Sequence, residues 1–319
     1  MLVQVSQPPF GVRGGAGAVV RRTAVRIGAL FSGDPSHPDH PAFLEGLAAL
    51  GYVEGRNLSI DARFDGGHLD RLPVLAAELA AAPVDMIIAM GAVHRRAAQQ
   101  AAPGVPIVFA AVVDPVAVGL VAEAGRPDGN ATGVTTFDPD EAQEGLRLLR
   151  TLIPDVRRLA VLGDAGVPDA LPNVARAAAA AEGLIAQVHL LRGLDDLEDA
   201  FAAMRAARAD AFVGLGVPIV RVHGARIAAL AWAARLPTLL ARDAAAFGPL
   251  LACGTSFAAA SRNVAKLVHR ILRGERAGDI PVERVVRPEL VVNLDLAREF
   301  GFVIPPAVLG RTTHVRAAG

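Results

Sequence analysis

The sequence has a single cysteine, Cys253, among its 319 residues. This excludes a disulfide within the chain and a cysteine-based zinc site. Aromatic residues are also scarce, at 4%, whereas apolar residues reach 52% and are largely alanine and valine. Such a chain fills large cores with small side chains and closely spaced elements. No stretch reaches the roughly 20 apolar residues that a membrane-spanning helix needs.

An excess of charge of either sign is also missing. Lys and Arg together number 32, as do Asp and Glu, so the formal net charge is zero. A nucleic-acid binder normally shows a basic excess or a basic stripe, and the balance therefore predicts no nucleic-acid partner. The high apolar content excludes disorder for most of the chain.

The N-terminal segment lacks the features of an export signal. A signal peptide has a basic start, an apolar centre and a small-residue cleavage site. Here no Lys or Arg occurs early, and Pro8, Pro9 and Arg13 interrupt the segment. We expect residues 1–23 to form a flexible leader, and without a clear signal peptide a cytoplasmic location stays open.

Short apolar runs alternate with amphipathic helical stretches in two successive series. Strand and helix alternate from Val25–Phe31 to Pro106–Ala110, and the pattern restarts with a helix over Glu141–Leu152. This pattern predicts an α/β fold of two Rossmann-like, doubly wound parallel-sheet lobes joined by a hinge. We expect lobe 1 to comprise residues 24–135 and about 251–278, and lobe 2 to comprise residues 136–250 and about 279–319.

The sequence motifs of common enzymes are missing. We find no G-x-S-x-G elbow, no H-E-x-x-H helix and no P-loop. The glycines at positions 11, 14, 15 and 17 precede the first strand, which is the wrong context for a dinucleotide-binding turn. We therefore expect no catalytic residues and no cofactor.

Candidate ligand-binding residues follow the ends of the predicted strands. In parallel sheets, ligands bind beyond the carboxyl ends of strands, where helix N-termini point their amides. Thr135, at the seam between the two series, is included as well. The candidates are Phe31, Ser32, Gly91, Ala92, Val93, His94, Val113, Asp114, Thr135, Asp164, Val217 and Asp243.

Structural explanations compete with ligand contact at several of these positions. Asp114 followed by Pro115 is typical of a helix start, where Asp caps and Pro fits the first turn. Asp243 could bind a ligand cation or pair with its neighbour Arg242. The segment from Asp34 to His40 holds two histidines three residues apart, but its prolines favour a solvated loop, so we predict no metal site.

Several segments, in order, resemble one known family. They are GLAALGYVEGRNLSIDARF, PVDMIIAMG, PIVFAAVVDPVAVGLV, GRPDGNATGVT, LVHRILRGERAGDIPVE and LVVNLDLAREFGFVIPPAVL. Together they resemble the ABC-transporter substrate-binding family that includes tryptophan- and tyrosine-type binding components, over roughly residues 24–313. Cys253 stands where family members usually carry tyrosine, and the few aromatic residues make an aromatic sandwich around an indole hard to build.

The resemblance implies a type I periplasmic binding fold with three hinge crossings and ligand closure between the lobes. It implies a monomeric, periplasmic protein that captures a small molecule, such as an amino acid or a related carboxylate, and delivers it to an ABC permease in the membrane. Two alternatives stay open: a cytosolic ligand-sensing domain of the same fold, and an enzyme built on paired Rossmann-like lobes.

Overall fold

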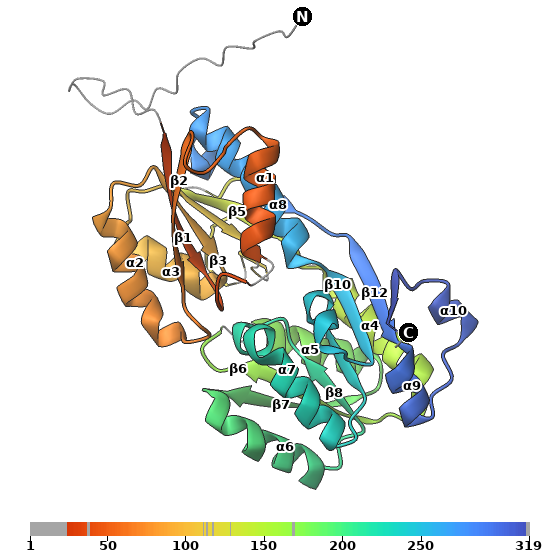
Figure 1. Cartoon of the computed structure of the whole chain (residues 1–319). Coiled ribbons are helices and arrows are strands. Elements are labelled where there is room, and N and C mark those ends of the chain that lie inside the picture. Colours follow the sequence, from red (N-terminus) through yellow and green to blue (C-terminus); the bar gives the residue numbers. More distant parts are fainter. Residues whose placement is uncertain are drawn as a thin grey trace, which may run out of the picture.

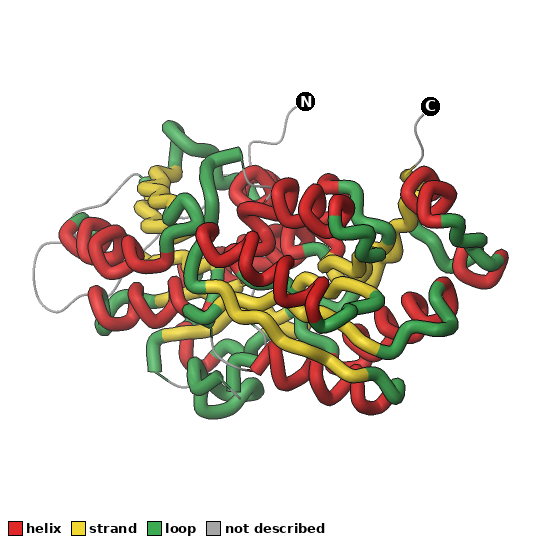
Figure 2. Tube along the Cα trace, turned by 90° about the horizontal axis from the view of Figure 1, so that it is seen from below, coloured by secondary structure: helices red, strands yellow, loops and turns green. Residues whose placement is uncertain are grey.

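The protein has two α/β lobes, one stacked on the other, and in each lobe the strands lie between layers of helices (Figure 1, Figure 2). The structure is a computed structural model that describes residues 24–316 except 37–38, 111, 113, 117, 128 and 168–169. The leader expected at residues 1–23 lies outside the described residues. Within the described part, no helix is both long enough and apolar enough to cross a bilayer.

Lobe 1 is built on a six-stranded sheet in the order β11-β5-β4-β3-β1-β2. All of its strand pairs are parallel. Its strands are β1 (Val25–Phe31), β2 (Leu58–Phe64), β3 (Met86–Met90), β4 (Ile107–Ala110), β5 (Ala131–Thr135) and β11 (Glu283–Arg284), and its helices are α1 (Asp39–Ala49), α2 (Leu72–Ala81), α3 (Ala92–Ala101) and α8 (Phe257–Leu272), with short 3-10 helices η1 (Leu69–Arg71) and η4 (Ala277–Asp279).

Both faces of this sheet are buried, which explains why its strands read as continuous apolar runs. Ile88 of β3 faces the cluster formed with α1 and α8, whereas its neighbour Ile87 faces the cluster formed with α2 and α3. Each such side chain contributes about 1.5–3 kcal/mol when fully buried. Helices α1 and α8 pack closely because Gly46 has no side chain; a Cβ there would lie 2.9 Å from the Arg262 carbonyl oxygen.

Lobe 2 has a seven-stranded sheet in the order β13-β12-β10-β9-β8-β6-β7. The sheet is parallel as predicted except at one pair, since β12 runs antiparallel to β10. The elements are α4 (Pro139–Leu152), β6 (Arg158–Asp164), α5 (Ala170–Ala181), β7 (Ile185–Leu191), η2 (Leu194–Asp196), α6 (Leu197–Ala206), β8 (Ala211–Gly214), α7 (Pro218–Ala233), β9 (Thr238–Ala241), η3 (Arg242–Phe247), β10 (Leu251–Thr255), β12 (Pro288–Asn293), α9 (Leu294–Phe300), α10 (Pro306–Leu309) and β13 (His314–Arg316).

The chain passes between the two sheets three times, after β5, after β10 and after β11. The predicted boundaries at residues 251 and 279 differ from this arrangement. Residues 251–255 form β10 in the sheet of lobe 2, and residues 283–284 form β11 in the sheet of lobe 1. The lobe to which β10 and β11 belong is set by the strands with which they pair. An apolar run alone does not reveal which of the two sheets a strand near the end of the chain joins.

Hydrogen bonds tie the three crossing segments together. The Arg284 side chain donates to the Phe137 carbonyl oxygen at 3.1 Å and pairs with Asp138 at 3.1 Å. The Thr255 hydroxyl oxygen accepts from the Arg287 amide at 2.8 Å. These contacts hold the connections between the lobes beside one another as a hinge.

Candidate functional site

The strand order of each sheet reverses at one place, and the two reversals face the boundary between the lobes. In lobe 1 the order is β2-β1-β3, and in lobe 2 it is β7-β6-β8. Loops leaving the carboxyl ends of strands diverge at such a point, which leaves a crevice for a ligand. The ends of β1, β3, β6 and β8 therefore mark the candidate site.

A small cavity of about 40 Å³ lies between these strand ends. Lobe 1 contributes the end of β1 and the first turn of α3; lobe 2 contributes residues around the ends of β6 and β8. Six of the predicted site residues line this cavity: Ser32, Gly91, Ala92, Val93, His94 and Val217. We call it the interlobe cavity.

His94 is held by a buried carboxylate that sequence reasoning missed. Its Nε2 lies 2.9 Å from Asp65 Oδ2, and both side chains are almost completely buried. Burial alone would raise the pKa of Asp65, but hydrogen bonds from His94 and from the Gly67 and Gly33 amides outweigh it and lower the pKa. An ionised carboxylate only accepts hydrogen bonds, so the Nε2 proton points to Asp65. The other ring nitrogen, Nδ1, is buried and finds no hydrogen-bond partner within the part of the chain that the structure describes.

Gly91 lets the backbone and His94 approach each other. Its φ of 139° is one that side-chain-bearing residues rarely adopt, and a Cβ would lie 2.8 Å from His94 Nδ1. Gly91 is the N-cap of α3, so the first amides of this helix lie at the cavity. Amides in a first helical turn have no partner within their own helix and favour an anion.

Arg221 of α7 brings a buried cation from lobe 2 to the same cavity. Its guanidinium forms an ion pair with Asp39 at the start of α1 in lobe 1. The guanidinium also stacks over the Phe257 ring, 4.3 Å from the ring centroid. The ion pair joins the two lobes directly.

Asp164, at the end of β6, also lies near the boundary and is buried. Its carboxylate accepts from the Gly166 amide at 2.8 Å and from the Ile219 amide at 3.4 Å. Burial raises the pKa of Asp164, these two amides lower it, and the negative charge of Asp65 in the other lobe raises it further. The two carboxylates are therefore close enough for the charge of one to act on the other.

Other predicted residues lie elsewhere. The Phe31 side chain packs inside lobe 1 and stacks on Phe64 with ring centroids 5.4 Å apart, so its prediction as a cleft side chain is wrong. The Thr135 hydroxyl donates to the Val112 carbonyl oxygen at 2.7 Å, a contact within lobe 1 near the hinge. Val113 lies outside the described residues.

The helix expected to start at Asp114 is not formed among the described residues of that segment, which are turns. Asp114 has a φ of 28°, and its carboxylate accepts from the Val116 amide at 3.2 Å. Asp often stabilises such a turn through its own side chain, and this local contact replaces the predicted helix cap.

Asp243 caps a helix of the other lobe. Its carboxylate accepts from the Ser256 hydroxyl and the Phe257 amide, both at 2.7 Å, at the start of α8. Arg242 pairs with Glu289 at 2.6 Å instead of with Asp243. Asp243 therefore fixes the second crossing, although it also lines a second cavity beside Arg221.

The loop weighed as a metal site has other contacts. The His40 ring packs edge-on against Phe31 and Phe64, with centroids 5.1 and 5.3 Å away. His37 lies outside the described residues. Over the described part of the chain, no group of three or more His, Cys, Asp or Glu is suited to a metal ion.

Asp65 follows directly after β2 and could have been found by the rule that was applied to the other strand ends. Its signal is weaker, because the alternating apolar and polar residues of Leu58–Phe64 are typical of a more exposed strand. Arg221 and Asp39 carry no comparable signal, since neither directly follows a strand and their pairing spans 182 positions of sequence.

Comparison with known proteins agrees with this architecture. A family model described as ABC transporter substrate binding protein matches residues 24–316. A curated tyrosine-binding protein of Clostridioides difficile is 24% identical over 263 residues, covering 79% of this chain and 73% of that protein.

Two solved structures have the same fold over most of the chain. A conserved domain protein of Vibrio cholerae matches with a TM-score of 0.86 and 26% identity, covering 92% of this chain and all of that one. A domain from Streptococcus pneumoniae in complex with L-Trp matches with a TM-score of 0.83 and 23% identity, covering 91% and 99%. With the family model matching nearly the whole described chain, the protein belongs to the ABC transporter substrate-binding protein family.

Proposed function

We propose that the protein binds an amino acid or a related small carboxylate at the lobe boundary, with the carboxylate group in the interlobe cavity. The observation that carries the proposal is the meeting of the α3 N-terminus from lobe 1 with buried Arg221 from lobe 2 at one cavity. Both features favour an anionic group, and they come from opposite lobes. The relatives named above, one tyrosine-binding and one solved with L-Trp, support the amino-acid class.

The carboxylate is held from both sides. The amides at the start of α3 donate to it, and the Arg221 guanidinium supplies the opposite charge. Ser32, whose hydroxyl oxygen lies 3.4 Å from His94 Nε2, offers a further donor at the same wall. Asp65 holds the His94 ring in place at this wall.

Binding and closure are coupled in this arrangement. A ligand that contacts both lobes prefers the closed form and shifts the population toward it. No bond is made or broken, and the family is one of solute-binding proteins. Delivery to an ABC permease, a periplasmic location, a monomeric state and the absence of a nucleic-acid partner are parts of the same proposal, supported by the family match and the balanced charge.

Thermal unfolding of refolded, ligand-free protein against a panel of amino acids and small carboxylates tests the proposal. A ligand at about a thousand times its dissociation constant adds roughly 4 kcal/mol and raises the midpoint by several degrees. A shift that is specific to a few carboxylates is expected. A flat panel with well-folded protein would refute the amino-acid assignment.

A pair of variants at one position tests the carboxylate site itself. Ala92→Pro removes the first amide of α3 while keeping a residue that suits the first helical position. Ala92→Ser keeps the amide and serves as the control. The proline variant is expected to bind the ligand at least about tenfold more weakly than the serine variant. Equal affinities would remove the α3 amides from the site.

A further inference from the structure

Lobe 2 contains a further cavity of about 180 Å³, which lies between its sheet and helices α4 and α5 and is larger than the interlobe cavity. Leu171 and Gly216 line both this cavity and the interlobe cavity, so the two adjoin. Its walls are mostly apolar, with Leu159, Val161 and Val213 from the sheet. We call it the lobe 2 pocket.

Small residues on the two helices create this space. Ala142 and Gly145 of α4 and Ala175 and Ala178 of α5 face the sheet, where larger residues would fill the gap. A buried apolar cavity of roughly 150 Å³ is large enough to bind benzene. The lobe 2 pocket therefore has room for a six-carbon ring or chain.

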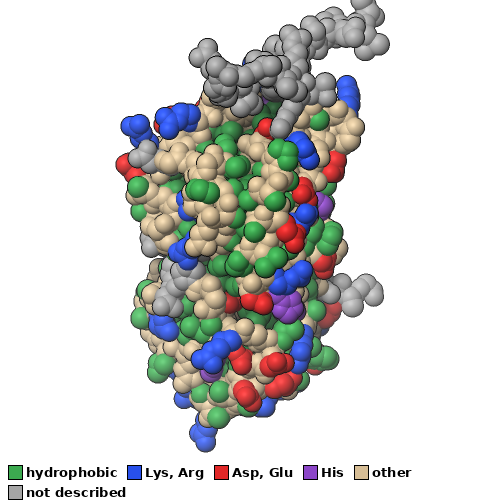
Figure 3. All heavy atoms as spheres, turned by 90° about the vertical axis from the view of Figure 1, so that its left-hand side faces the viewer, with side chains coloured by type: hydrophobic (Ala, Val, Ile, Leu, Met, Phe, Trp, Pro, Cys, Tyr) green, Lys and Arg blue, Asp and Glu red, His purple; other side chains and the backbone are tan. Residues whose placement is uncertain are grey.

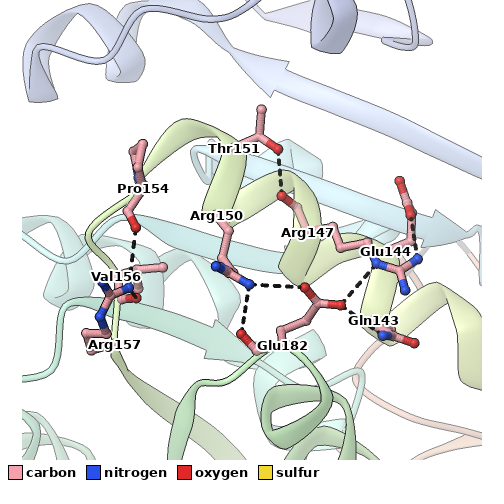
Figure 4. Close-up of polar contacts among 9 residues, drawn as sticks. All are labelled: Gln143, Glu144, Arg147, Arg150, Thr151, Pro154, Val156, Arg157 and Glu182. Carbon is pink, nitrogen blue, oxygen red and sulfur yellow. Dashed lines mark hydrogen bonds and ion pairs between the residues drawn. The ribbon is translucent and has the colours of Figure 1, made fainter.

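The helices that form the walls are fastened to each other on their outer side. Glu182, just after α5, accepts from Gln143 at 2.8 Å and from Arg147 at 3.0 Å, both on α4 (Figure 4). Arg150 of α4 donates to the Glu182 carbonyl oxygen at 2.8 Å (Figure 4). These contacts fix α4 and α5 relative to each other, and they therefore maintain the space between the two helices and the sheet.

One carboxyl group in the wall has an unused oxygen. Glu141 Oε1, in the first turn of α4, is buried and has no hydrogen-bond partner among the described residues. Gly254 provides the room for it, since a Cβ there would lie 2.8 Å from Oε1. The neighbouring charged residues of the wall are already paired, Asp138 with Arg284 and Arg242 with Glu289.

Burial raises the pKa of Glu141 to about 7, partly offset by a hydrogen bond from the Thr255 amide. The nearby negative charge of Asp138 raises it further, and Arg284 lowers it. A buried carboxyl with an unused oxygen is costly unless a donor, best a cation, completes its hydrogen bonds. The pocket thus combines an apolar body with one site for a positively charged donor.

We propose that the lobe 2 pocket binds the apolar part of the solute and that Glu141 binds an amino group carried by that part. The inference rests on the proposed function for the identity of the solute as a carboxylate held in the adjoining cavity. The solute class becomes a carboxylate whose apolar portion, up to about six carbons, bears a protonated amine.

Straight-chain primary amines of four to eight carbons test the pocket without involving the carboxylate site. Each is compared by calorimetry at pH 8 with the alcohol and the carboxylate of equal length. The amines are expected to bind about tenfold to hundredfold more tightly than the alcohols, since a charge-assisted hydrogen bond is made. Amines that bind no better than alcohols, or not at all, would overturn the assignment.

Three variants locate the binding. Glu141→Gln is expected to abolish the preference for amines. Ala175→Leu fills the pocket and is expected to weaken every member of the series about tenfold or more, whereas Ala177→Leu, on the exposed side of the same helix, leaves binding unchanged. Unfolding midpoints of the ligand-free variants verify that each folds. Amine binding that survives Glu141→Gln or Ala175→Leu would refute the site.

The two proposals fail in different ways. If the carboxylate panel is flat but amines bind and respond to Glu141→Gln, the pocket stands and the interlobe carboxylate site is wrong. If carboxylates bind and respond to Ala92→Pro while the amine series shows no dependence on Glu141, the function stands and the pocket assignment is wrong.

Discussion

Arg221 and Asp39 form an ion pair between the lobes, and both side chains are more than nine-tenths buried. One lies in α7 of lobe 2 and the other at the start of α1 in lobe 1. On the face seen in Figure 3, acidic, basic and histidine side chains stand beside one another along the boundary between the lobes. The pair is thus a buried contact between the lobes. In the proposed function, where the ligand contacts Arg221, this pair links ligand binding to closure.

Arg221→Met is expected to favour the open form. Removing one partner of a buried pair costs about 3–5 kcal/mol if the other stays buried, and opening relieves this by returning Asp39 to water. With ligand present, the variant is expected to show a larger radius of gyration than wild type in small-angle X-ray scattering. Its affinity for the ligand is expected to be at least about tenfold lower. Arg226→Met, which breaks an exposed pair with Glu198 within lobe 2, is the control. An unchanged radius and affinity would contradict the role of the pair.

Gly91→Ala is expected to destabilise the protein by about 1–3 kcal/mol, because the left-handed φ is strained for alanine and the new methyl group meets His94. Urea denaturation measures the loss. Gly104→Ala is the matched control, since a Cβ there meets no atom within 4 Å. Equal stabilities of the two variants would show that the close approach between Gly91 and His94 does not stabilise the fold.

Asp65 gives a prediction for acid stability. Its folded-state pKa lies below the ordinary 3.8, so its contribution is fully present above that pH and is lost as pH falls through the folded value. Between pH 5 and roughly pH 3, the wild type is therefore expected to lose more stability than Asp65→Asn. Urea denaturation across this range measures the difference. Parallel curves for the two proteins would contradict the assignment.

His223 gives a prediction for closure at mildly acidic pH. It lies against lobe 1, where its Nε2 is 2.9 Å from the position of a Cβ on Gly67. Burial first, then the charges of His68 and Arg226, lower its pKa below 6.5. The closed form is therefore stable above that pH and is weakened as pH falls, because protonation favours a hydrated imidazole.

The measurement is ligand affinity at pH 7.5 and pH 5. Wild type is expected to bind more weakly at pH 5, and His223→Gln is expected to lose part of this dependence. His189→Gln is the control, because burial also lowers the pKa of His189 but it lies on β7, the edge strand of lobe 2. If His189→Gln lost the pH dependence and His223→Gln kept it, the weaker binding at pH 5 would come from lower stability of lobe 2, and the role of His223 would be refuted.

Asp243→Ala separates capping from ligand contact. Loss of its hydrogen bonds to Ser256 and Phe257 is expected to lower stability by about 1–2 kcal/mol, as for other helix caps. Ligand affinity is expected to stay within about twofold of wild type, a change of under 1 kcal/mol. A large loss of affinity with unchanged stability would return Asp243 to the binding site.

Periodicity was sufficient for the α/β class and for many elements. The bounds of β1 follow directly from its apolar pattern, because the turn residues Ser32 and Gly33 end the run sharply. The family resemblance and the two-lobed architecture are confirmed by the family match and the solved structures. Ser32 and residues 91–94 were predicted because they follow strand ends, and they do line one cavity. They lie together because parallel strands share their carboxyl edge.

The remaining features depend on contacts between distant parts of the chain. Phe31 ends a strand, but the parity of the pleat turns its side chain into the core. Asp39 and Arg221 come from different lobes and lie 182 positions apart in sequence, so no local pattern encodes their contact. The lobe 2 pocket arises from alanines and glycines that, in sequence, are indistinguishable from ordinary helix-packing residues.

The threefold crossing of the chain has a consequence for biosynthesis. Helix α8 and strand β11, which complete lobe 1, and strands β10 and β12, which belong to the sheet of lobe 2, all come from residues 251–293. Neither lobe can close its core while the ribosome still holds this segment. The two halves are therefore expected to acquire their native packing together and late, rather than one domain after the other as synthesis proceeds.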